Sequence, residues 1–233
     1  MRKFKLILEY DGAAFCGWQT QAPGLRTVQN HLEEKIERIF KKKVHCHASG
    51  RTDSGVHALG QVAHFKADTR LSPKIIHKAL NTFLDRDLSV RDVREVPLDF
   101  DAQRSVKNKT YRYTILNRAY PSALWRDRAY FYPGKLNITA MRKAAASLKG
   151  KRDFKNFQSA SRRSNLKNTV RTVRRLTITK EGDFLHITIT ADGFLYKMVR
   201  NIVGTLIAAG SKDRKLAPKT APGHGLCLVR VRY

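Results

Sequence analysis

The stretch VHCHASGRTDSGVHALGQVAHFKA, residues 44–67, contains the pattern on which the predicted fold depends. Hydrophobic and polar residues alternate in VHCHAS, residues 44–49, and again in QVAHFKA, residues 61–67, as they do in strands that bury one face. Three glycines lie between or beside these two runs, and glycine permits the tight turns that join neighbouring strands. The stretch therefore predicts two strands joined by a glycine-rich loop.

The flanking segments extend this pair to a strand, helix, strand, strand, helix, strand order. A strand at 3–10 and an amphipathic helix at 28–41 come before the pair, and Thr27 is a suitable N-cap for that helix. A second amphipathic helix begins near Pro73, since proline suits a first helical turn, and a strand near 88–96 completes the set.

The remaining residues repeat the same order. The pattern predicts a strand at 107–117, a helix at 138–149, a hairpin of strands at 170–179 and 183–191, a strongly apolar helix at 194–209 and a closing strand at 225–233. We therefore predict an α+β protein of two ferredoxin-like (RRM-like) βαββαβ halves, residues 1–104 and 105–233. Together they would form a mixed, largely antiparallel sheet with helices on one side.

The charge of the chain indicates a polyanionic partner. Lysine and arginine number 46 against 19 acidic residues, which gives a formal net charge of +27. Such a charge repels itself, and nucleic acid is the partner that best accounts for it. An anionic membrane surface is the weaker alternative, because neither end of the chain reads as a basic amphipathic helix with a large apolar face.

The cysteines and the N-terminus favour a cytoplasmic protein without a metal. Cys16, Cys46 and Cys227 form no closely spaced pair, which is typical of thiols in a reducing compartment. His45 and His47 flank Cys46, but on a strand they would point away from it, so we predict no metal site there. No apolar run has the length of a signal-peptide core or a membrane span.

The loop around Asp53 admits three interpretations. A phosphate-binding loop is rejected, because Val56 and His57 follow the second glycine where Lys and Ser or Thr would be needed. An ordinary turn is the second interpretation, since aspartate and serine commonly bind turn amides. The third is catalytic: a lone carboxylate kept ionised by a cation such as Arg51, with glycines that let RNA approach closely.

Five motifs in order resemble the tRNA pseudouridine synthase A family and together span nearly the whole chain. GRTDSGVHALGQVAHF, residues 50–65, is similar to the signature of that family. The other four are LEYDGAAFCGWQTQ at 8–21, KTYRYTI at 109–115, GFLYKMVRNIVGTL at 193–206 and APGHGLCLVRVRY at 221–233.

The resemblance implies isomerisation of uridine to pseudouridine in the anticodon stem-loop of tRNA, at positions 38–40, by a homodimer that needs no cofactor. It implies that Asp53 is the catalytic residue and that Tyr111 packs on the target base. It further implies that Arg200 pairs with Asp53 and that Arg51 fills the space left by the displaced base. The target nucleotide would have to leave its stack.

The basic segment 151–175 is the expected contact for the rest of the RNA. It contains nine lysines and arginines and one acidic residue, and we name Arg162, Arg163, Lys167 and Arg171 as RNA-binding candidates. The chain departs from the family at 208–220, where the sequence is shorter and predicts no helix, and this bears on dimer or peripheral tRNA contacts. A non-catalytic RNA-binding protein, or a pseudouridine synthase for another RNA, are the alternative functions.

Overall fold

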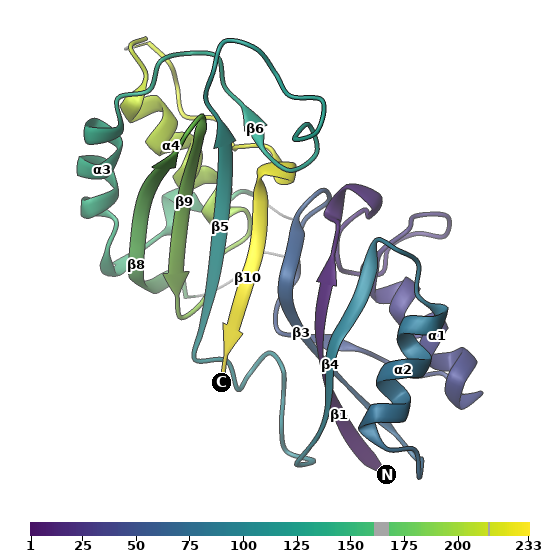
Figure 1. Cartoon of the computed structure of the whole chain (residues 1–233). Helices are drawn as coiled ribbons and strands as arrows, with labels where there is room; N and C mark the ends of the chain where they lie inside the picture. The colour runs from purple at the N-terminus through teal and green to yellow at the C-terminus, as the bar shows by residue number, and fades with distance from the viewer. Residues whose placement is uncertain (161–167, 214) are drawn as a thin grey trace. The chain divides into compact units, whose positions relative to one another are not determined.

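The computed structural model describes residues 1–160, 168–213 and 215–233 (Figure 1). The chain divides into two compact units, with Met1–Lys107 and Leu228–Tyr233 in unit 1 and Asn108–Cys227 in unit 2. The sequence placed residues 228–233 in the second half, whereas their contacts place them in unit 1. Each unit combines helices with mostly antiparallel strands, which confirms the predicted α+β class.

Unit 1 has the predicted βαββαβ order. Its elements are β1 (Arg2–Tyr10), a 3-10 turn η1 (Gly12–Ala14), α1 (Val28–Phe40), β2 (His47–Ala48), β3 (His57–Ala67), α2 (Pro73–Phe83) and β4 (Leu88–Val96). Strand β1 pairs antiparallel with both β3 and β4, and β2 pairs antiparallel with β3. The loop that carries Asp53 therefore joins two paired strands, as predicted.

Local sequence accounts for both helices of unit 1. The Thr27 hydroxyl accepts a hydrogen bond from the Asn30 amide over 3.3 Å, so Thr27 is the N-cap of α1 as predicted. The Ser72 hydroxyl caps α2 by accepting from the Ile75 amide, and Pro73 occupies the first helical turn. Leu32 and Ile36 of α1 are completely buried, and Phe40 packs on Phe65 of β3 with ring centroids 5.9 Å apart.

The predicted strand at 44–49 is mostly wrong, because only His47–Ala48 is a strand. The Cys46 amide donates to a carboxylate oxygen of Glu33 in α1 over 2.8 Å, so a helix side chain satisfies the group that a strand neighbour would otherwise bind. Strand β3 in turn begins at His57, earlier than the predicted 61.

Unit 2 has the predicted order with two short strands added. Its elements are β5 (Asn108–Leu116), β6 (Tyr130–Phe131), α3 (Ile138–Ser147), β7 (Gly150–Asp153), η2 (Lys155–Phe157), β8 (Val170–Glu181), β9 (Phe184–Ala191), α4 (Met198–Gly210), η3 (Gly223–Gly225) and β10 (Leu226–Arg232), the last crossing into unit 1. Strand β9 pairs antiparallel with β5 and β8, β7 pairs antiparallel with β8, and β6 pairs parallel with β5. The sequence missed β6 and β7.

Helix α4 begins later than predicted. The apolar period suggested 194–209, but Lys197 has a left-handed φ of 57° and the helix starts at Met198. Phe194 and Leu195 belong to the loop before it, and their apolar side chains still pack inward, so periodicity extended the predicted helix too far. Within the described residues, no helix is long and apolar enough to cross a lipid bilayer.

Candidate active site

Asp53 lies at the start of a tight turn between β2 and β3. The Val56 amide donates to the Asp53 carbonyl oxygen over 3.2 Å, which closes the turn. Asp53 is half-buried, whereas Thr52 before it is buried and Ser54 after it is exposed. The backbone of the predicted catalytic residue is therefore held at the boundary between core and solvent.

A buried polar network supports the base of this loop. The Ser49 hydroxyl donates to the Gln61 amide oxygen over 2.7 Å, and the Gln61 amide nitrogen donates to the Gly50 carbonyl over 2.9 Å. The Tyr10 and Thr52 hydroxyls are 2.8 Å apart. Ser49 and Gln61 are completely buried, and leaving any of these groups unpaired would cost about 1–3 kcal/mol, so the network fixes the path of the loop.

A second segment, residues 11–26, holds the other side of the loop, and we name it the strap. The Trp18 amide donates to the Thr52 carbonyl over 3.0 Å. The Gly55 amide donates to the Phe15 carbonyl over 3.4 Å. The strap is thus hydrogen-bonded to the residue before Asp53 and to the second residue after it.

The strap approaches the loop so closely that Gly17 has no room for a side chain. A Cβ at Gly17 would lie 2.8 Å from the Thr52 carbonyl oxygen and 3.1 Å from the Asp53 carbonyl carbon, and Gly17 has a φ of +93°. Trp18 and Phe15 on either side are buried. In the sequence this segment was recognised only as part of a motif, and its structural role was missed. Gly17 in the triplet CGW was the residue that could have indicated a close backbone contact.

Tyr111 occupies β5 of unit 2 and is 7% exposed. Its ring packs edge-on against Phe194, with ring centroids 5.1 Å apart and planes at 90°. This geometry is the favourable T-shaped arrangement of two aromatic quadrupoles. Tyr111 is therefore an anchored aromatic side chain, as a residue that packs on a base would need to be.

Lys109 lies two residues before Tyr111, on the same face of β5. Burial lowers the pKa of its ammonium group to about 8, because desolvation disfavours the charged form. The sequence did not single out this lysine, since a lysine in a strand is ordinarily solvated.

Arg200 lies in the first turn of α4 and is held by the segment that precedes β10. Its Nε donates to the Ala221 carbonyl over 2.7 Å, and the Ala221 amide donates back to the Arg200 carbonyl over 3.1 Å. The Tyr113 hydroxyl donates to the neighbouring Pro222 carbonyl over 2.9 Å. The same short segment therefore connects the arginine of α4 with the tyrosine strand.

Close backbone contact fixes that segment on α4. A Cβ at Gly204 would lie 1.8 Å from the Lys219 carbonyl oxygen, so the helix and the segment meet without an intervening side chain. The Thr220 hydroxyl donates to the Asn201 amide oxygen over 2.6 Å. These contacts hold the segment against α4 beside Arg200.

The remaining predicted residues are placed as follows. Arg51 is exposed, in the loop beside Asp53. Arg171 lies near the start of β8, where it donates to the Asn168 carbonyl over 3.1 Å. Arg162, Arg163 and Lys167 lie outside the described residues. Asp53 and Arg51 belong to unit 1 and Tyr111 and Arg200 to unit 2, so the pairing of Asp53 with Arg200 stays a prediction.

Two kinds of sequence comparison assign this chain to the same protein family. A family model described as tRNA pseudouridine synthase matches residues 6–103 and 144–217. The chain belongs to this family. The tRNA pseudouridine synthase family model covers Arg51, Asp53 and Arg200, while Tyr111 lies between its two matched segments.

Curated members of the tRNA pseudouridine synthase family match over their whole lengths. The tRNA pseudouridine synthase A of Caldicellulosiruptor bescii is 42% identical over 100% of both chains. The tRNA pseudouridine synthase A of Geobacter sp. strain M21 is 41% identical over 100% of this chain and 99% of its own. Among solved structures, a chain of a Cbf5–Nop10–Gar1 complex aligns with a TM-score of 0.42 and 13% identity, over 99% of this chain and 58% of that one.

Proposed function

We propose that this protein isomerises uridine to pseudouridine in tRNA and that Asp53 is the catalytic residue. The observation that carries the proposal is the match to tRNA pseudouridine synthases along the entire chain, with Asp53 in the matched region. The structure supports it physically, because the loop of Asp53 is bound from both sides by the strap and by a buried network. Catalysis requires this kind of positional control of the reacting group.

The reaction exchanges one bond to the sugar for another. The N1–C1′ bond of uridine breaks, the uracil rotates and C5 bonds to C1′; C5 loses its hydrogen and N1 gains one. Asp53 acts either as a nucleophile at the sugar or as a base that removes a proton from it. In both routes the carboxylate must be ionised at the start. No electron transfer or group donor is involved, so no cofactor is part of the proposal.

Three other side chains complete the proposed site. Tyr111 packs on the target base, with its ring held by Phe194. Arg200 pairs with the Asp53 carboxylate and balances its negative charge in the proposed site. Arg51 is exposed and long enough to fill the space that the flipped nucleotide leaves, which offsets part of the few kcal/mol of unstacking.

The proposed substrate is the anticodon stem-loop of tRNA, at uridines 38 to 40, bound by a cytoplasmic homodimer. The net charge of +27 supports a grip through phosphates. Arg171 is the described member of the predicted RNA-contact set, which also includes Arg162, Arg163 and Lys167. The sequence at 208–220 is shorter than the family pattern, which bears on the dimer contact or on peripheral tRNA contacts rather than on the chemistry.

A pseudouridine assay on tRNA tests the proposal directly. Wild-type protein should form pseudouridine, Asp53→Asn should form none while binding tRNA with the affinity of the wild type, and Asp68→Asn should behave as wild type. Asp68 is the matched control, because its carboxylate is 75% exposed on the same unit and the substitution changes the net charge equally. Wild-type protein that binds tRNA without forming product would favour the non-catalytic RNA-binding alternative.

The choice of RNA needs a separate measurement. Mapping pseudouridine in total RNA from cells with and without the protein should show loss at tRNA positions 38 to 40. Loss of pseudouridine at sites in another RNA instead would support the proposed reaction but show that the substrate is a different RNA.

A further inference from the structure

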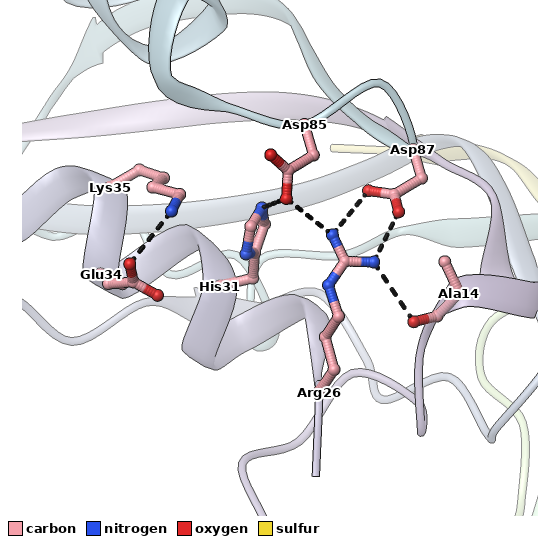
Figure 2. Close-up of polar contacts among 7 residues, drawn as sticks. All are labelled: Ala14, Arg26, His31, Glu34, Lys35, Asp85 and Asp87. Carbon is pink, nitrogen blue, oxygen red and sulfur yellow. Dashed lines mark hydrogen bonds and ion pairs between the residues drawn. The ribbon is translucent and has the colours of Figure 1, made fainter. Parts of the chain in front are cut away.

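The strap is attached at both of its ends to one residue, Asp87, in the turn before β4. At its start, the Asp11 amide donates to the Asp87 carbonyl over 2.9 Å. At its end, the Arg26 guanidinium binds the Asp87 carboxylate with two nitrogens, Nη2 lying 2.9 Å from Oδ1 (Figure 2). The strap is therefore closed into a loop whose base is Asp87.

Arg26 also contacts residues 14–16 of the strap. Its carbon Cζ lies 4.4 Å from the centroid of the Phe15 ring, a cation–π distance. Its Nη1 donates to the Ala14 carbonyl over 3.4 Å, and its own carbonyl accepts from the Cys16 amide over 2.8 Å. Arg26 thus touches three consecutive residues, one of which, Phe15, binds the Gly55 amide in the loop of Asp53.

Two carboxylates and one histidine surround the Arg26 guanidinium. Its Nη2 also donates to the Asp85 carboxylate over 3.0 Å, so a single guanidinium bridges two acids. The third polar neighbour is His31, whose buried Nε2 lies 3.3 Å from the same Asp85 oxygen. Burial, with Arg26 and Lys35 nearby, lowers the pKa of His31 and keeps it neutral, so Arg26 is the permanent cation of the cluster.

Resting on the proposed function, we propose that Arg26 is a positioning residue for catalysis: bridged to Asp85 and Asp87, it holds the strap against the turn that carries Asp53. The guanidinium fixes Phe15, the Phe15 carbonyl fixes Gly55, and the same strap fixes Thr52 through Trp18. Arg26 touches no reacting atom in this account. Through these backbone contacts, Arg26 fixes the direction of the Asp53 carboxylate.

Another ion pair in the same unit provides a matched control. Arg2 of β1 binds both carboxylate oxygens of Glu95 in β4, with Nε 2.9 Å from Oε1, and also donates to the Leu71 carbonyl over 2.8 Å. The side chains of Arg2 and Arg26 are 29% and 37% exposed. Arg2 therefore has the same chemistry and a similar environment, but its hydrogen bonds within the described part of the chain go to β4 and to residues 69–71 rather than to the strap.

The experiment compares Arg26→Gln, Asp87→Asn and Arg26→Lys with Arg2→Gln and Glu95→Gln, as full-length proteins that are folded at the assay temperature. The readouts are kcat and KM for pseudouridine formation in tRNA, and hydrogen exchange of the amides of residues 52–56. Each arginine-to-glutamine variant lowers the net charge equally, so a loss of phosphate attraction affects both in the same way.

We expect Arg26→Gln and Asp87→Asn to lower kcat about tenfold to a hundredfold, as a small misplacement of a reacting group does, with KM changed less than about twofold. Exchange at 52–56 should accelerate in both. Arg26→Lys, which keeps the charge but not the two-pronged geometry, should recover part of kcat. Arg2→Gln and Glu95→Gln should keep the kcat and the 52–56 exchange of the wild type.

Equal kcat losses in the Arg26 and Arg2 variants would overturn the proposal, and so would a loss confined to KM, which would make Arg26 an RNA contact. If the wild type forms no pseudouridine, the proposed function fails. In that case, unchanged exchange at 52–56 in Arg26→Gln would overturn the positioning role, and accelerated exchange would support it.

Discussion

The backbone amide of Trp18 donates a hydrogen bond to the Thr52 carbonyl across 3.0 Å, so the residue before Asp53 is bound to a segment 34 positions earlier in the chain. Because the loop of Asp53 takes its position from this distant segment, changes in the strap should affect the proposed catalytic residue without touching it.

Gly17→Ala should lower both stability and kcat. The new methyl group would lie 2.8 Å from the Thr52 carbonyl oxygen, so the strap and the loop must separate. We expect the free energy of unfolding to fall by about 1–3 kcal/mol and kcat to fall by roughly tenfold or more. Urea unfolding and the pseudouridine assay measure the two effects.

Gly182→Ala, outside the strap, is the control for that prediction. Gly182 also has a positive φ, +58°, but a Cβ there would meet nothing within 4 Å among the described residues. It should show the backbone strain alone, with kcat unchanged. An equal loss of kcat in both variants would argue that contact between the strap and the Asp53 loop is unimportant.

Tyr111 should contribute to stability chiefly through its ring. Tyr111→Ala removes a side chain that is 7% exposed and packed on Phe194, so the free energy of unfolding should fall by about 3–5 kcal/mol. Tyr111→Phe keeps the ring and should stay within about 1 kcal/mol of wild type. Any loss of kcat in a folded Tyr111→Phe protein would then report on the hydroxyl group. A large destabilisation by Tyr111→Phe would contradict this description of the packing.

His64 should make unit 1 sensitive to acid. Its Nδ1 accepts a hydrogen bond from the Ala102 amide over 3.1 Å, and burial, with His47 and Lys3 nearby, lowers its pKa from 6.5 to about 4. Between these values the unfolded chain binds the proton that the folded chain excludes, so the contribution of His64 to stability falls as pH drops from about 6.5 to about 4 and changes no further below.

His64→Gln should flatten this dependence, because an amide oxygen can accept the Ala102 hydrogen bond without titrating. The measurement is the urea midpoint at closely spaced pH values for both proteins. Identical slopes in wild type and His64→Gln would show that other groups cause the acid sensitivity.

Binding of tRNA should weaken steeply with salt. A protein of net charge +27 that neutralises six to ten phosphates loses about 10³–10⁵ in affinity between 50 and 200 mM salt. Arg171→Gln should reduce the salt slope by about one if Arg171 contacts a phosphate. A shallow slope for the wild type would argue against a phosphate-dominated interface.

The order of elements was predictable because it depends on local information. Thr27 and Ser72 cap their helices with their own side chains, and alternation marked the hairpin of β8 and β9. The net charge and the motif around Asp53 are likewise properties of the linear chain. The net charge predicted a nucleic-acid partner, and the resemblance that includes the motif implied that Asp53 is the catalytic residue, a role that stays a prediction.

The errors arose where distant residues compete with local pattern. Residues 44–46 alternate as a strand would, but Glu33 of α1 takes the Cys46 amide. Phe194 continues the apolar period of α4, yet it lies in a loop and packs on Tyr111. In both cases a tertiary partner supplied an interaction that no local preference encodes.

Composition and periodicity determined the class of this protein, its element order and the type of its partner, since each depends on residues close together in the chain. That Arg26 binds Asp87, 61 positions away, and that the strap so formed hydrogen-bonds to Thr52 and Gly55 around Asp53, is visible only in the folded chain. The physical reason is that an ion pair across such a separation has no periodic signature: it exists only once folding has brought the two charges together.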